Sequence, residues 1–180
     1  MNAITSSYTK TQQLLKVMYV FAWIVFIGLS INFGAVLICF IVSLINPAIA
    51  PKLMDWSQLA TLQEQGPLQY YSVGSLLIVF SLVKVYLSQI MLQLLSGVKM
   101  QSPFTPKTVR LLEKMSYFFL SAAAIAYLYN TQLAYIRKDL NISLDKISIE
   151  QFLILGGLVF ILSQIFKRGV EIQTENELTV

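Results

Sequence analysis

The chain of 180 residues is 56% hydrophobic and only 12% charged, with a formal net charge of +4. An average soluble domain has roughly 25% charged residues, so this composition excludes an ordinary water-soluble fold. The sequence has one cysteine and no histidine, which excludes an intrachain disulfide and removes the commonest general base and metal ligand. We therefore expect no catalytic residues, no metal and no cofactor.

Four apolar runs dominate the sequence, and a bilayer core of about 30 Å needs about 20 helical residues. Each run is long enough, and the only charged residues inside the runs are Lys84 and Glu150. The sequence thus predicts an all-α membrane protein, with four transmembrane helices in one bundle and a single domain over residues 1–180. The predicted spans cover residues 17–45, 71–95, 115–136 and 148–166, followed by a short cytoplasmic tail at 167–180.

The positive charges predict the orientation of these spans. With four spans, both termini and the second loop share one side, which carries eight lysine and arginine residues, whereas the other side carries four. Positive residues accumulate in short cytoplasmic segments, so we expect both termini in the cytoplasm. The net positive charge then reflects membrane topology, and we expect no direct nucleic-acid partner.

The first outer loop has apolar residues at helical spacing between Pro51 and Gln65. This pattern predicts a short amphipathic helix in the outer interface, with Trp56 at headgroup depth. An ordinary loop with a few apolar residues is the alternative.

Two helix starts can be predicted from capping residues. Thr105 followed by Pro106 gives a hydroxyl cap and a proline at the first helical position, so the third helix begins in the cytoplasm before its apolar part. Ser148 and Gln151 have capping-box spacing and predict the start of the fourth helix.

A basic face opens the third helix, since Lys107, Arg110 and Lys114 recur at i, i+3 and i+7. An anchor to anionic lipid headgroups explains this face more simply than a partner-docking surface. Both interpretations stay open.

Lys84 lies in the middle of the second span, where a lysine costs about 2.5–3.5 kcal/mol on insertion scales. The sequence predicts a polar seam in the bundle interior that holds its side chain. In one interpretation the seam is a substrate or proton path; in the other, which we favour, it fixes helix packing, because no acidic residue lies in a membrane core. The seam residues are Asn32, Ser81, Lys84, Ser88 and Asn130.

Two segments on the predicted cytoplasmic side carry a family resemblance. Ser102-Pro103-Phe104-Thr105 precedes the third helix, and the chain ends in Gly-Val-Glu-Ile-Gln-Thr-Glu-Asn-Glu-Leu-Thr-Val from Gly169. Together they resemble the bacterial four-helix membrane family catalogued as domain of unknown function 2975. Its members have a Pro-Phe-Ser/Thr turn and a similar ending, in which Asp is usual at the position of Glu177 and Ile at that of Val180.

The resemblance implies a multi-pass protein of the bacterial cytoplasmic (inner) membrane whose biochemical activity is not established. Genes of the family often lie beside one for a small helix-turn-helix regulator. The resemblance therefore suggests a non-enzymatic protein whose cytoplasmic face binds such a partner. A small transporter, channel or export factor that uses the seam around Lys84 is the alternative, and homo-oligomerisation is left open. The candidate interaction surface comprises Phe104, Lys107, Arg110, Lys114, Gly169, Glu171, Glu175, Asn176, Leu178 and Thr179.

Lys167 and Arg168 are expected to stop the fourth helix at the inner headgroups, and Gly169 to permit a bend. Beyond it, apolar residues alternate with acidic ones. The tail then docks on the 105–114 helix, with Glu171 and Glu175 beside its basic residues, or docks on a partner, or stays disordered.

Overall fold

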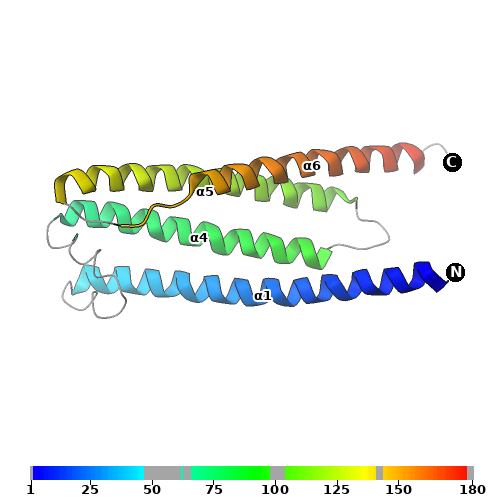
Figure 1. Cartoon of the computed structure of the whole chain (residues 1–180), viewed down its shortest axis with the longest axis horizontal. Helices are drawn as coiled ribbons and strands as arrows, with labels where there is room; N and C mark the ends of the chain where they lie inside the picture. The colour runs from blue at the N-terminus through cyan, green and yellow to red at the C-terminus, as the bar shows by residue number, and fades with distance from the viewer. Residues whose placement is uncertain (1, 47–61, 63–65, 98–103, 141–143, 178–180) are drawn as a thin grey trace. The chain divides into compact units, whose positions relative to one another are not determined.

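The computed structural model describes residues 2–46, 62, 66–97, 104–140 and 144–177. In these ranges the chain is helical, with no strand. The four long helices are α1 (Asn2–Ile45), α4 (Pro67–Gly97), α5 (Pro106–Leu140) and α6 (Ile149–Glu177) (Figure 1).

All four helices are long and apolar enough to cross a membrane. The all-α, four-span fold predicted from the sequence is thereby confirmed, and the protein is a multi-pass membrane protein. The helices extend beyond the predicted spans, because capped polar turns continue them past the hydrocarbon. The predicted interfacial helix at 51–65 lies, apart from Leu62, outside the described residues.

The chain forms two compact units, and each helix contributes a segment to both. The terminal unit comprises Met1–Gly28, Tyr86–Phe119 and Ile154–Val180. The central unit comprises Leu29–Val85 and Leu120–Leu153. In the terminal unit the first turns of α1 and the last turns of α6 lie at the same end (Figure 1). That this end faces the cytoplasm stays a prediction.

The predicted helix starts agree with the structure. α5 begins at Pro106, and the Thr108 amide donates to Thr105 Oγ1 at 3.2 Å, so Thr105 caps the helix. α6 begins at Ile149, directly after Ser148. Pro67 opens α4 at a position where the missing N–H of proline costs nothing.

The predicted end of the fourth helix is wrong. α6 runs without interruption through Lys167, Arg168 and Gly169 to Glu177. One glycine costs a helix only about 1 kcal/mol relative to alanine. Local contacts continue on both sides of it: Arg168 pairs with Glu171 at 2.9 Å, and the Thr174 hydroxyl donates to the carbonyl of Val170.

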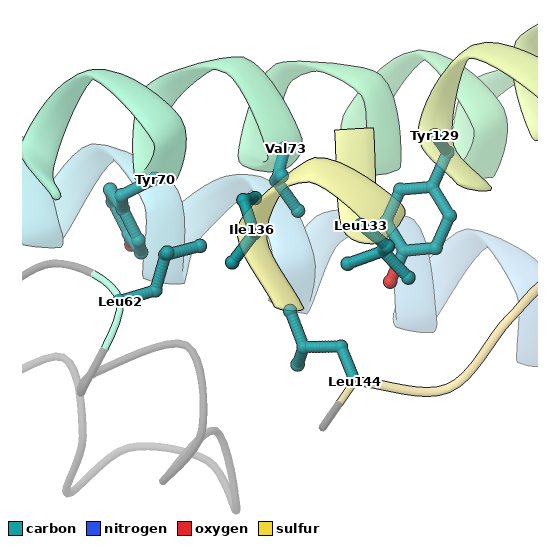
Figure 2. Close-up of a cluster of buried hydrophobic side chains, with 7 residues drawn as sticks. All are labelled: Leu62, Tyr70, Val73, Tyr129, Leu133, Ile136 and Leu144. Carbon is teal, nitrogen blue, oxygen red and sulfur yellow. The ribbon is translucent and has the colours of Figure 1, made fainter. Parts of the chain in front are cut away.

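The central unit is organised around a buried apolar cluster between α4 and α5 (Figure 2). Tyr70 and Val73 of α4 pack with residues from three successive turns of α5. Phe40 of α1 stacks on Tyr70 with 6.1 Å between ring centroids. A Cβ atom on Gly74 would lie 2.5 Å from the Phe40 ring, so a larger residue there would require this ring to move. The α5 residues are Tyr129, Leu133 and Ile136, and Leu62 and Leu144 complete the cluster.

Polar side chains tie the helices together inside each unit. In the terminal unit the buried Ser116 hydroxyl of α5 donates to the carbonyl of Gly156 in α6 at 2.9 Å. In the central unit the Asn130 amide group donates to the carbonyl of Ile147 at 2.8 Å, and the Ile147 N–H donates back to Asn130 Oδ1 at 3.0 Å. This reciprocal pair fixes the segment before α6 against α5.

We predict that Asn130→Ala destabilises the protein by about 2 kcal/mol, because it leaves both backbone groups of Ile147 unpaired in a partly buried site. The free energy of unfolding in mixed micelles, titrated with denaturing detergent, measures the change. Asn32→Ala removes the same side chain from an exposed position and should cost less than 0.5 kcal/mol. Equal losses in the two variants would contradict the assigned role of Asn130.

Candidate functional site

The two segments that carry the family resemblance meet in the terminal unit. The Phe104 ring packs on Phe166 of α6, with 5.1 Å between ring centroids. The same ring lies against Gly169, where a Cβ atom would come within 2.7 Å of Phe104 Cδ1. Gly169 therefore does not bend α6; its missing side chain leaves the space that the Phe104 ring needs. We call this contact the Phe104 clasp.

The turn that carries Phe104 is itself fixed by the start of α5. The hydroxyl groups of Thr105 and Thr108 lie 2.9 Å apart and share a hydrogen bond. Thr108 and Val109 are buried, so the first turn of α5 packs into the terminal unit. Phe104, one residue before the cap, is thus held against α6 by a buried and capped helix start.

The three residues of the predicted basic face at the start of α5 differ in their contacts. Lys114 Nζ donates to the hydroxyl of Tyr86 in α4 at 2.7 Å and lies 5.0 Å from the centroid of that ring. Tyr86 in turn packs on Phe118, with 4.6 Å between ring centroids. Lys114 therefore links α5 to α4, although it is exposed, as Lys107 and Arg110 are.

Glu171 of α6 pairs within its own helix, and not with the basic residues of α5 as the self-docking hypothesis expected. Glu171 pairs with Arg168 one turn earlier on the same helix, and both side chains are exposed. Such surface pairs contribute about 0–1 kcal/mol. Glu175 and Asn176 are also exposed, and Leu178 and Thr179 lie outside the described residues. The contact that the structure shows between this part of α6 and the start of α5 is the Phe104 clasp.

The candidate surface consequently combines the exposed ends of two helices. Lys107 and Arg110 come from α5, and Glu171 and Glu175 come from α6. The Phe104 clasp joins the start of α5 to the last turns of α6. Exposed charges of both signs at two joined helix ends are typical of the rim of a protein interface.

The predicted intramembrane seam is only partly assembled. In the central unit, Lys84 is half-buried and its Nζ lies 5.1 Å from the centroid of the Phe80 ring, one turn earlier on α4. Phe80 packs edge-on against Phe152 of α6, with 5.4 Å between ring centroids. Ser81, next to Phe80, is buried. The aromatic ring that accompanies Lys84 was missed in the sequence, although its i, i+4 spacing could have indicated it.

The other seam residues lie elsewhere. Asn130 is engaged with Ile147, and Asn32 is exposed on α1. Ser88 belongs to the terminal unit, where it lines an apolar pocket of about 470 Å³ between α1 and α4. Over the described ranges no group of three or more carboxylate or thiol side chains could hold a metal ion.

A comparison with protein families adds one finding. A family model described as Protein of unknown function (DUF2975) matches residues 55–180. The chain belongs to this family. The resemblance inferred from the Phe104 turn and the final residues is thereby confirmed, and in this DUF2975 protein the match includes the whole of α4, α5 and α6. Neither a curated protein nor a solved structure matches the chain.

We predict that the effect of Gly169→Ala changes sign with residue 104. With Phe104 present, the new methyl group forces the ring to move and lowers stability by about 1 kcal/mol. In a Phe104→Ala background the space is open, and the same substitution raises stability by about 1 kcal/mol through helix propensity. Thermal unfolding of the four proteins in one detergent measures this double-mutant cycle.

Gly157→Ala is the matched control, because nothing lies within 4 Å of a Cβ atom placed there. It should be stabilising in both backgrounds. If Gly169→Ala behaved like Gly157→Ala with Phe104 present, the clasp would contribute nothing.

Proposed function

We propose that this DUF2975 protein is a non-enzymatic protein of the bacterial inner membrane, with both termini in the cytoplasm, whose cytoplasmic face binds a protein partner. The observation that supports this proposal is the Phe104 clasp. It brings the two segments with the family resemblance, the turn before α5 and the last turns of α6, into contact. A helix end that only anchored the protein in headgroups would not need this contact.

The charges of the surface favour a protein over a nucleic acid. Arg110 and Lys107 could bind phosphates, but Glu171 and Glu175 project from the adjoining helix end and would repel them. A partner with acidic and basic side chains could satisfy both sets. The family resemblance suggests a small helix-turn-helix regulator, held at the membrane and away from its operator.

Site-specific photocross-linking tests the proposal. A photoreactive phenylalanine analogue at Arg110 or at Glu175 of the full-length protein should cross-link to a co-expressed regulator encoded beside its gene. The same analogue at Ile161, a lipid-exposed position of α6, should give no such product. Equal cross-linking from all three positions, or none from Arg110 and Glu175, would reject the surface.

Removal of Gly169 to Val180 separates the two halves of the surface. The truncated protein should lose cross-linking from Arg110, because the clasp and the acidic half are gone. Membrane insertion, measured as resistance to carbonate extraction, should stay intact, since the apolar parts of all four helices remain. Unchanged recovery of the regulator would remove the end of α6 from the binding surface.

The alternative function, a small transporter or channel, has Lys84 as its supporting observation. A half-buried cation in a membrane span, beside an aromatic ring, is the kind of residue that can line a path for ions or protons. The engagement of Asn130 elsewhere weakens this alternative, because the path then has fewer polar groups.

We predict that Lys84→Met leaves the protein inserted and at least as stable. The substitution removes a charge whose insertion at the centre of a membrane costs about 2.5–3.5 kcal/mol. It also removes one cation–π contact, which stabilises the protein by at most about 2 kcal/mol. Proton flux into liposomes containing a pH-sensitive dye, compared between the native protein and the variant, decides between the functions. Flux that depends on Lys84 would favour the transport function; equal flux favours the partner-binding function.

A further inference from the structure

A polar groove runs between α4 and α5 in the central unit. Its volume is about 660 Å³. Gln69 and Ser72 line it from α4, and Gln132 from α5. Each directly precedes a residue of the buried cluster, namely Tyr70, Val73 and Leu133. The groove therefore lies on the surface of the α4–α5 contact, and Figure 2 shows the buried side chains of that contact. The packing of these side chains fixes the shape of the groove.

The groove lies near the ends of two helices that are long and apolar enough to span a membrane, and polar side chains there usually face a partner or water. Gln69, Ser72 and Ser75 recur every three residues and so share one face of α4. Thr131 and Gln132 meet them from α5. Of the described residues, none that lines the groove is charged. Its chemistry is that of neutral amides and hydroxyl groups.

The hydrogen-bond donors and acceptors that line the groove restrict the chemistry of its occupant. The Ser75 hydroxyl donates to the carbonyl of Ser72, and the Thr131 hydroxyl donates to that of Tyr127, each at 2.8 Å. These two hydroxyls can therefore only accept from an occupant. The Gln69 and Gln132 amides offer both donors and acceptors, and neither has a hydrogen bond to any residue of the described ranges.

An occupant of the groove thus has to donate as well as accept hydrogen bonds. A phosphodiester group only accepts, and an acyl chain does neither. Water does both, but the apolar side chains of the lining favour an occupant that also has apolar surface. A second, identical groove offers both, because the two amides of one copy can pair with the amides and hydroxyls of the other about a two-fold axis. Glutamine, serine and threonine associate transmembrane helices in this way.

The shape of the α4–α5 surface is also self-complementary. Leu68, Leu128 and Tyr135 flank the groove and are 80%, 53% and 67% exposed. Each copy therefore carries both a groove and apolar side chains that project beside it. We propose that this α4–α5 face is a homodimer interface, in which the grooves of two copies of the chain close on each other.

Association in liposomes tests the proposal. The full-length protein, labelled separately with donor and acceptor fluorophores, is reconstituted at decreasing protein-to-lipid ratios, and energy transfer gives the dissociation constant. The double variant Gln69→Leu/Gln132→Leu should dissociate at about tenfold higher protein density, since it loses the amides but gains apolar surface that lipid covers equally well.

The matched control is Gln89→Leu/Gln93→Leu, which makes the same changes at exposed positions of α4 outside the groove. It should associate like the native protein, and circular dichroism should show equal helix content in all three. A native protein that stays monomeric at every ratio would overturn the interface, as would equal weakening in both variants.

Cysteine cross-linking in native membranes gives an independent measurement. In a Cys39→Ser background, Ser72→Cys and Thr131→Cys should form disulfide-linked dimers on oxidation, and Ile161→Cys on α6 should not. Dimers that form from Ile161→Cys but not from the groove positions would place self-association on another face and overturn the proposal.

Discussion

The absence of water around the spans is the constraint from which the rest of the structure follows. A peptide group in hydrocarbon has no solvent to bond, so the chain has to satisfy its backbone within helices. The four helices are accordingly long, and the same constraint acts on side chains. Apolar residues can point outward without cost, whereas each polar side chain needs a partner or access to the headgroups.

Several polar side chains of this DUF2975 protein meet that requirement in one of two ways. Ser116 and Asn130 bond to backbone groups of a neighbouring segment and thereby hold α5 in place. Lys114 and Lys84 lie over aromatic rings, which stabilise a cation without a second charge. The glutamines between α4 and α5 fit neither pattern within one copy, and a second copy would supply what they lack. Polar residues are thus the part of the sequence that determines helix contacts, because lipid does not favour one apolar contact over another.

The sequence predicted well what depends on one helix at a time. Hydrophobic length gave the four spans, and Thr105 with Pro106 gave the start of α5, because both signals are local. The sequence-based predictions failed where the role of a residue depends on a contact with another helix. Gly169 alone suggested a bend, and only the ring of Phe104, distant in sequence, explains why glycine stands in a continuous helix. Likewise, spacing grouped Lys114 with Lys107 and Arg110, but the contact with Tyr86 of α4 removes Lys114 from the shared face. Asn130 was assigned to the seam by depth alone, which cannot say which neighbour an amide bonds.

The extent of the family match bears on where the function resides. The match begins at residue 55, so it covers α4, α5 and α6 and leaves out α1. The Phe104 clasp and the charged helix ends lie entirely on the matched helices, as does the α4–α5 groove. In α1, most of the large apolar residues are exposed, and its contact with α4 in the central unit rests on Phe40 against Tyr70 and Gly74. Exposure of this kind suits a helix surrounded by lipid. The residues of the Phe104 clasp and of the α4–α5 groove can therefore be compared directly with the family model.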